Sequence, residues 1–312
     1  AGAGLTHTAM EQAVAASKCD ADEAEVVQTG CMGLCSRGPL VRLESRDQEP
    51  VLYGDVSAEV AQQIVAQHVP MAESDGPEDL EEDEGEQSPH DILHYRASLR
   101  RAGRKKGLEK HIIPLDSPFF SKQVKIVLTE TGKIDPDKLE DYLAHGGYKA
   151  LAKVLETMTP KEVCDLIQES GLRGRGGAGF PTGLKWNFVL QEDAAQKYVI
   201  VNGDEGDPGA YMDRTVMEDD PHRVLEGMMI CAYAVGASYG YFYIRGEYPI
   251  AIQRIRRAIR MAPSSMGQSC FSGDDELMLV NMRGWDSKSS RLSPAAMRTI
   301  SIASSTRSAP SE

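Results

Sequence analysis

Residues 170–186, SGLRGRGGAGFPTGLKW, constrain this chain more than any other segment. The run holds six glycines among seventeen residues and also carries Arg173, Arg175 and Lys185. Glycine permits positive φ and lets backbone N–H groups approach a ligand without an intervening Cβ. A loop of this kind before a helix N-terminus is suited to bind an anion, usually a phosphate. A flexible linker would lack aromatic residues, so the aromatic residues at 180, 186 and 188 favour a binding loop for a ring-bearing cofactor.

Two further segments agree with this interpretation, VNGDEGDPGA at 201–210 and MDR at 212–214. Together with the glycine-rich run they resemble the FMN and NADH site of the flavoprotein subunit of respiratory complex I, whose relatives occur in NAD(P)-linked hydrogenases and formate dehydrogenases. The Gly-Asp-Pro-Gly variant is more similar to the hydrogenase-type relatives. The resemblance covers residues 1–262 in two blocks. It implies an enzyme, an NADH or NADPH dehydrogenase subunit that passes hydride to FMN and single electrons to iron–sulfur clusters.

The resemblance also assigns residues to the cofactors. It implies that the glycine-rich loop and Lys185 hold the phosphate of FMN, and that aromatic side chains beside the loop hold the rings of NADH. The residues expected to bind cofactor are Gly174, Arg175, Gly176, Gly177, Ala178, Gly179, Phe180, Lys185, Phe188, Asn202, Asp204, Glu205 and Asp207. Glu205 is also expected to be catalytic, although catalysis would consist mainly of positioning two rings. The alternative for the three acids is an acidic turn around Pro208, because Asp, Gly and Pro are common turn residues.

A second group of chemistry-bearing residues is CMGLC at 31–35. Two thiols at this spacing can bind one iron of a [2Fe–2S] cluster, which needs four ligands. The segment resembles the cluster loop of thioredoxin-like ferredoxins, and this implies Cys31 and Cys35 as metal ligands. The other two ligands are expected upstream of Ala1, so half of the ligand set is present; two free thiols are the alternative.

The family resemblance also indicates which cofactor-binding segments are not found after residue 262. Relatives continue into a Gly-Glu-Glu-Thr flavin segment and then a four-cysteine [4Fe–4S] motif, and neither occurs here. We therefore expect a flavin domain that is truncated at its C-terminal end and has low activity by itself. Two other classes stay open: an electron-transfer module without catalytic flavin, and a non-catalytic assembly fragment.

The charge and hydropathy of the chain indicate which classes of partner and which location to expect. Nine acids and no Lys or Arg lie within residues 73–86, and the net charge of the chain is −13. This argues against a nucleic-acid partner. We expect no signal peptide, and no apolar stretch reaches the length of a membrane span. We expect a cytoplasmic protein, or one peripheral to a membrane complex, whose partners are NADH and other iron–sulfur subunits of a multisubunit oxidoreductase.

The order of expected elements predicts an α/β chain in four segments. Residues 1–70 fit a thioredoxin-like [2Fe–2S] domain, with helices at 5–18 and 57–69 and strands at 25–29, 39–43 and 51–53. Residues 71–110 form an acidic and then basic linker, 111–262 the α/β FMN- and NAD-binding domain with a parallel sheet, and 263–312 an aberrant or disordered tail with one strand at 275–282.

The pattern of apolar and polar residues within 111–262 predicts the individual strands and helices of this domain. Strands are expected at 124–128, 198–201 (buried) and 239–244, and helices at 136–145, 147–157, 160–171, 221–236 and from 249. The helix from Pro249 places Ile252, Ile255 and Ile259 on its buried stripe and its arginines off it. Cys164 and Cys231 are expected to be packed small residues inside helices. The histidines at 90, 94, 111, 145 and 222 are expected at the surface or at caps.

Overall fold

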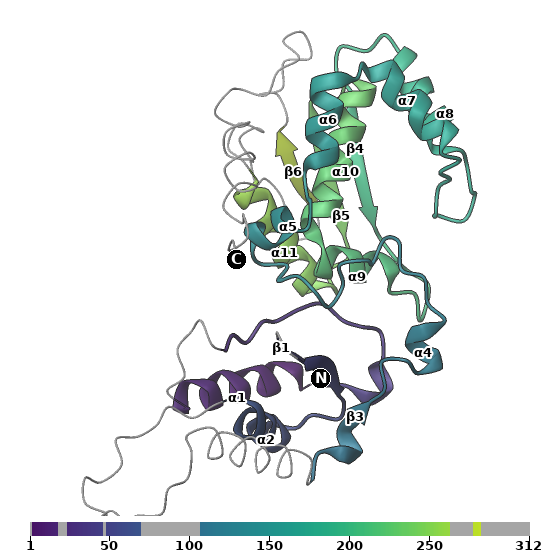
Figure 1. The fold of residues 1–312 in the computed structure, drawn as a ribbon. Helices are drawn as coiled ribbons and strands as arrows, with labels where there is room; N and C mark the ends of the chain where they lie inside the picture. Colours follow the sequence, from purple (N-terminus) through teal and green to yellow (C-terminus); the bar gives the residue numbers. More distant parts are fainter. Residues whose placement is uncertain (1, 18–23, 46–47, 70–106, 263–276, 282–312) are drawn as a thin grey trace, which may run out of the picture. The chain divides into compact units, whose positions relative to one another are not determined.

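The computed structural model describes residues 2–17, 24–45, 48–69, 107–262 and 277–281 (Figure 1). The chain divides into two compact units. The first consists of Ala1–Gln28 and Gly33–Lys125, and the second of Thr29–Met32 and Ile126–Glu312. The chain therefore joins the second unit for only four residues, Thr29–Met32, and then returns to the first.

The first unit combines helices with an antiparallel sheet. Its elements are α1 (Ala3–Ala16), the 3₁₀ turn Cys35–Arg37, β1 (Val41–Ser45), β2 (Gln48–Tyr53), α2 (Ala58–His68), the 3₁₀ turn Glu109–His111, β3 (Ile112–Ile113) and α4 (Pro118–Ser121). The sheet has the order β1-β2-β3. A small core forms where α1 and α2 cover this sheet, and its buried members are Ala9, Tyr53, Val56, Ala61, Ile64 and Leu108.

Both helices predicted for the first unit are confirmed. Ser57 begins α2 by accepting a hydrogen bond from the Val60 backbone N–H, as expected of an N-cap. The predicted strand at 25–29 is wrong, because these residues have no strand partner in the described part of the chain. The thioredoxin-like assignment stays a prediction. The 71–110 linker and the 263–312 tail fall mostly outside the described residues.

The second unit holds the remaining elements. They are α5 (Leu139–Ala144), α6 (Lys149–Thr157), α7 (Pro160–Glu169), α8 (Thr182–Gln191), β4 (Tyr198–Gly203), α9 (Met212–Asp219), α10 (Pro221–Val235), β5 (Tyr239–Ile244), α11 (Pro249–Met261) and β6 (Leu277–Asn281). Thr159 and Glu162 form the predicted capping box of α7. Gly236, at φ 75°, ends α10 in the left-handed conformation that favours glycine. Helix α9 was missed by the sequence patterning.

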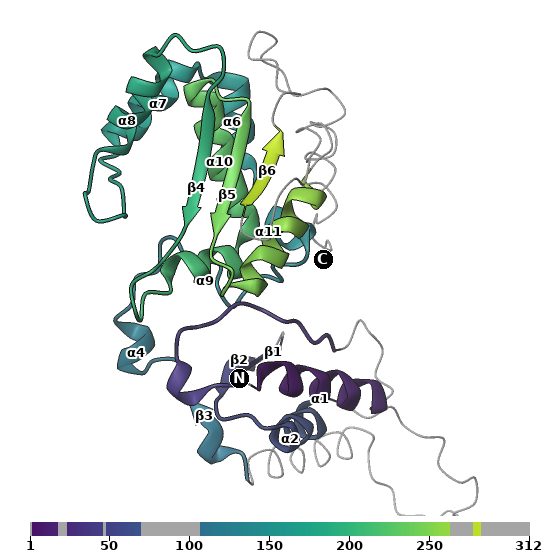
Figure 2. The same cartoon turned by 180° about the vertical axis from the view of Figure 1, so that it is seen from behind.

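The sheet of the second unit has the order β4-β5-β6. Strands β4 and β5 are parallel, which confirms the predicted parallel pair, and β6 adds antiparallel to β5. The long connection between the parallel strands contains α9 and α10. Figure 2 shows the strands from the side opposite α10. The predicted strand at 124–128 is wrong: Val124 and Ile126 are exposed and have no strand partner among the described residues.

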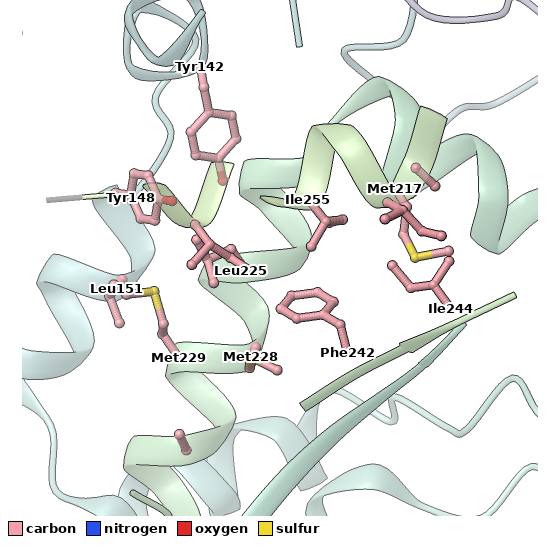
Figure 3. Packing of buried hydrophobic residues seen from close by; sticks show 14 of the residues in the cluster. Tyr142, Tyr148, Leu151, Met217, Leu225, Met228, Met229, Phe242, Ile244 and Ile255 are labelled. Atoms are coloured by element: carbon pink, nitrogen blue, oxygen red, sulfur yellow. The ribbon is translucent and has the colours of Figure 1, made fainter. Parts of the chain in front are cut away.

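The core lies on one face of this sheet. Phe242 and Ile244 from β5 pack against Leu225 of α10 and Ile255 of α11 (Figure 3). The other face of β4 is open, since Tyr198 is 52% and Ile200 is 65% exposed. The expectation of a buried strand is therefore wrong, because described helices cover only one face of a sheet that is normally covered on both.

In helix α11, one arginine that was expected off the buried stripe is itself buried. Ile252, Ile255 and Ile259 are buried as predicted, but Arg254 is also buried, at 8% exposure. Its Nη1 donates to the Glu218 carbonyl at 2.6 Å, and its Nε lies 3.8 Å from a carboxylate oxygen of Asp137. Periodicity places Arg254 beside the apolar stripe, and these two acceptors compensate the charge there.

Two histidines that were expected at the surface or at caps are buried. His222 is 1% exposed and stacks on Tyr142, with 5.5 Å between ring centroids, and its Nδ1 lies 3.0 Å from the Tyr148 hydroxyl. His111 is also buried, and its Nδ1 lies 2.9 Å from the Gly54 carbonyl oxygen. Tertiary packing covers both rings.

The predicted helical positions of Cys164, which is buried, and Cys231, which is half-buried, are confirmed.

Burial of His222 predicts an acid-sensitive fold. Burial lowers the pKa of His222 from 6.5 to about 4. The unfolded chain then binds more protons than the folded one below pH 6.5, so stability is full above that pH and falls as pH approaches 4. Between pH 7 and pH 4.5 the loss from this group is about 2 kcal/mol.

Urea unfolding at pH 7 and pH 4.5 measures this loss in the wild-type chain and in His222→Gln. Asp219 acts in the opposite direction, because burial raises its pKa to about 6. It titrates in both chains, so the difference between them isolates His222. Equal pH dependence in the two chains would contradict the prediction.

Candidate functional site

The glycine-rich segment folds as a loop that closes on itself. Beyond α7, the Gly174 backbone N–H donates to the Phe180 carbonyl and Arg173 Nη1 donates to the Gly179 carbonyl, each at 2.9 Å. Gly177 and Gly179 have φ of 99° and 61°, in the left-handed region. The loop ends at the N-terminus of α8, which confirms the predicted loop-to-helix arrangement.

The first turn of α8 offers unpaired donors. The Thr182 backbone N–H donates to the Leu172 carbonyl, and the Lys185 N–H donates to the Pro181 carbonyl. By helix geometry, the intervening N–H groups of Gly183 and Leu184 have no acceptor within the helix. The Lys185 side chain is exposed on the same turn. These backbone dipoles and this cation are the donor set that a phosphate needs.

Two aromatic side chains lie beside this turn. The ring centroids of Phe180 and Phe188 are 6.4 Å apart with 48° between the ring planes. They are 45% and 50% exposed, which is high for apolar rings. An exposed aromatic pair next to an anion site can accept a planar ring that carries a phosphate.

The acidic turn 202–207 follows β4 at its carboxyl end. Asn202 Oδ1 accepts from the Asp204 backbone N–H at 2.9 Å. Asp204 and Asp207 are exposed. Both sets of predicted residues belong to the second unit, and Figures 1 and 2 show the glycine-rich loop beside the sheet, on the side of the carboxyl end of β4. No hydrogen bond or ring contact joins the two sets within the described residues.

Glu205 differs from the other acids because its carboxylate is engaged. Its Oε1 and Oε2 accept from the backbone N–H groups of Asp213 and Arg214, each at 3.2 Å. A carboxylate at these N–H groups caps α9 and complements its dipole. Burial and the Glu205 charge raise the pKa of Asp213. The structure therefore gives Glu205 a structural contact, and its catalytic role stays a prediction.

Arg245 and Tyr248 contact this turn, and the sequence alone did not point to them. Arg245 Nη1 donates to the Glu205 carbonyl at 2.6 Å, and the Tyr248 hydroxyl donates to the same oxygen at 3.4 Å. The guanidinium groups of Arg214 and Arg245 lie 5.5 and 5.7 Å from the Tyr248 ring centroid. The signal was present in the sequence: these residues directly follow β5, at the same end of the sheet as the turn after β4.

The two cysteines belong to different units, Cys31 to the second and Cys35 to the first. Both are exposed. No group of three or more His, Cys, Asp or Glu side chains that could hold a metal occurs in the part of the chain that the structure describes. The described residues therefore do not fit a complete [2Fe–2S] site, and the ligand roles of Cys31 and Cys35 stay predictions.

Comparison with known proteins decides what the glycine-rich loop belongs to. Residues 167–299 match the family model described as the Nuo51 FMN-binding domain. This part of the chain is similar to that family. The loop, α8 and the acidic turn all lie within the residues that match this family model. The donor set described above fits the phosphate of FMN. The predicted resemblance to flavoprotein subunits of complex I and of hydrogenases is confirmed.

Individual relatives agree with this family. The chain is 58% identical over 138 residues to the NADP-reducing hydrogenase subunit HndC of Solidesulfovibrio fructosivorans, which covers 44% of this chain and 28% of that protein. It is 50% identical over 137 residues to an NADH-quinone oxidoreductase subunit of Rhizobium meliloti, which covers 44% and 32%. The chain thus spans less than a third of the length of either relative.

Among solved structures, an NAD+-reducing [NiFe]-hydrogenase in the air-oxidized state matches with a TM-score of 0.37 and 28% identity, over 52% of this chain and 28% of that chain. A TM-score this low carries no argument about the fold. In the described residues, no helix is both long and apolar enough to cross a membrane.

Proposed function

We propose that this chain is the FMN-binding part of an oxidoreductase subunit that oxidises NADH or NADPH within a multisubunit complex. The observation that carries the proposal is the glycine-rich loop ending at the α8 N-terminus inside the FMN-binding domain, 167–299. The relatives named above, a hydrogenase subunit and a quinone oxidoreductase subunit, support partner subunits as the onward electron acceptors.

Each residue group has a role in this proposal. Backbone N–H groups of Arg175–Gly179, and those of Gly183 and Leu184 in the first turn of α8, bind the phosphate, with Arg175 and Lys185 supplying positive charge. Phe180 and Phe188 hold the rings of the nicotinamide nucleotide. Asn202, Asp204 and Asp207 provide polar groups at the edge of the flavin ring, while Glu205 keeps the turn fixed on α9.

Bound FMN supplies the chemistry of taking two electrons together and releasing them singly. The protein's contribution is to hold two rings in contact and to exclude water from them. The described residues do not complete an iron–sulfur site. The [4Fe–4S] cluster expected of longer relatives stays a prediction.

Flavin binding tests the proposal directly. Titration of FMN into the chain, followed by quenching of flavin fluorescence, measures affinity, and ferricyanide reduction by NADH or NADPH measures turnover. Binding with turnover supports the enzyme. Binding without turnover supports an electron-transfer module, and absence of FMN binding supports an assembly fragment and contradicts the proposal.

Gly176→Ala separates binding from folding. A Cβ at Gly176 meets no atom within 4 Å, and its φ is not in the left-handed region. The melting temperature should therefore change little. A methyl group where the phosphate approaches the backbone should weaken FMN binding about tenfold or more, the factor expected for losing a hydrogen bond to a charged group.

The matched control is Gly227→Ala on α10, where a Cβ is equally free and the position lies outside the site. It should bind FMN as the wild-type chain does. Unchanged FMN affinity in Gly176→Ala would remove this part of the loop from the site.

A further inference from the structure

One buried side chain of the second unit contacts the four-residue segment Thr29–Met32, which belongs to the same unit. Asp219, the last residue of α9, is 1% exposed. Its Oδ1 accepts from the Cys31 backbone N–H at 3.1 Å. We propose that Asp219 is a positioning residue, whose carboxylate holds the Cys31 segment at a fixed place on the FMN-binding unit.

Close packing at Gly30 supports this role. A Cβ on Gly30 would lie 1.9 Å from Asp219 Cγ and 2.1 Å from Oδ1, distances that no real Cβ contact shows. The Gly30 backbone therefore lies directly against the carboxylate. The adjacent Met32 packs on Gly132, where a Cβ would lie 3.2 Å from Met32 Cγ. Three successive residues of the segment thus contact the second unit.

Helix α9 relates this attachment to the acidic turn. Glu205 caps its N-terminus, and Arg254 Nη1 donates to the Glu218 carbonyl near its C-terminus. A carboxylate at the first turn and a cation at the last both complement the helix dipole, so α9 is held at each end. Eight residues of helix span about 12 Å, and this sets a constant spacing between the Glu205 cap and Asp219.

What this spacing between the Glu205 cap and Asp219 does for the protein rests on the proposed function. If FMN binds at the acidic turn, Asp219 keeps the Cys31 thiol at a constant distance from the flavin. The guanidinium of Arg214 is near enough for the Cys31 thiol to contribute to raising the pKa of Arg214, after the larger contributions from Glu218 and Tyr248. The hydrogen bond itself does not depend on flavin, so the two ideas fail separately.

Selective labelling with 15N-cysteine tests the hydrogen bond. The chain has six cysteines, so its spectrum holds six backbone amide signals, which Cys→Ser variants assign. In Asp219→Ala the Cys31 amide should exchange with solvent about tenfold faster or more. Asp219→Asn keeps an acceptor oxygen and should restore protection. The Cys35 amide, which donates to the Gly33 carbonyl within the first unit, should not change and serves as the control.

Gly30→Ala provides a second, independent test. The added methyl should expel the segment and expose the Cys31 amide, while Gly30→Ala combined with Asp219→Gly removes the collision. Unchanged exchange at Cys31 in both Asp219→Ala and Gly30→Ala would overturn the proposal. Equal acceleration at Cys31 and Cys35 would also overturn it, since that indicates general loss of structure.

The functional purpose has its own measurement. A nitroxide is attached to Cys31 in a chain whose Cys19, Cys35 and Cys270 are replaced by Ser. Bound FMN should lose more fluorescence in the labelled chain than in the same chain without the nitroxide, and this additional loss should be smaller in Asp219→Ala. If FMN does not bind, the proposed function fails while the amide result stands. If FMN binds and quenching is equal in both chains, Asp219 does not set the distance.

Discussion

Replacing Glu226 by Ala should lower the free energy of unfolding by about 3–5 kcal/mol. Glu226 is 7% exposed on α10. Its Oε2 accepts from the Tyr142 hydroxyl and, at 2.8 Å, from the Tyr148 backbone N–H, and its Oε1 accepts from the Leu151 N–H at 3.0 Å. Removing the carboxylate leaves three buried donors without an acceptor, each costing about 1–3 kcal/mol before relaxation.

Two of these donors belong to the start of α6, so the substitution also removes a negative charge from a helix N-terminus. Urea unfolding measures the change. Glu226→Gln keeps one acceptor oxygen and should lose about 1–3 kcal/mol. The exposed Glu156→Ala on α6 is the control and should stay within about 0.5 kcal/mol of wild type. A loss below about 1 kcal/mol in Glu226→Ala would contradict this account.

Gly183→Ala should destabilise the chain and remove FMN binding together. Helix propensity by itself predicts the reverse, because Ala in a helix is favoured over Gly by about 1 kcal/mol. However, a Cβ on Gly183 would lie 2.3 Å from the Gln168 backbone nitrogen and 2.5 Å from its Cα. Backbone cannot move aside as a side chain can, so α7 and α8 must separate.

The expected cost is about 1–3 kcal/mol, as for other overpacked contacts, minus the propensity gain. Separation of α7 and α8 also displaces the loop between them, so FMN affinity should fall about tenfold or more. Gly227→Ala, in a helix but with no atom within 4 Å of the new Cβ, should gain about 0.5–1 kcal/mol. A Gly183→Ala chain that melts and binds FMN like wild type would show that α7 and α8 tolerate the separation.

The substitutions at Glu226 and Gly183 test different parts of the second unit. Glu226 lies away from the glycine-rich loop in sequence and contacts α6, so its loss measures the core that supports α10. Gly183 lies in the first turn of α8, where the phosphate is proposed to bind, so its loss measures how the site depends on helix packing. Gly176→Ala completes the series, because it changes the site without changing the packing.

Local signals in the sequence were sufficient for much of the second unit. Thr159 with Glu162 and Gly236 mark a helix start and a helix end through contacts within a few residues. The spacing of glycines and aromatic residues around 170–188 was sufficient to place a loop before a helix and to predict the FMN-binding family. Such features depend on neighbours in the chain, so no tertiary information is needed to read them.

Tertiary structure decided the roles of the charged and titratable side chains. The sequence placed Arg254 off the apolar stripe of its helix and His222 at a surface or cap, and it did not indicate which groups the Glu205 carboxylate contacts. The fold buries Arg254 against Glu218, encloses His222 between tyrosines, and uses Glu205 to cap α9. Each partner comes from a different element, and the polarity of a side chain does not tell which element will reach it.

The Cys31 segment shows the same division. The spacing of Cys31 and Cys35 is a local pattern, and it predicts a shared metal site. Only the folded chain places Cys31 in one unit and Cys35 in the other, and brings the Cys31 N–H to Asp219, 188 residues later in the sequence. The sequence by itself determined most of the helices, the loop before α8 and the resemblance to a family, because these depend on local patterns of residues. The fold determined which carboxylate meets which donor, because that depends on packing between distant segments.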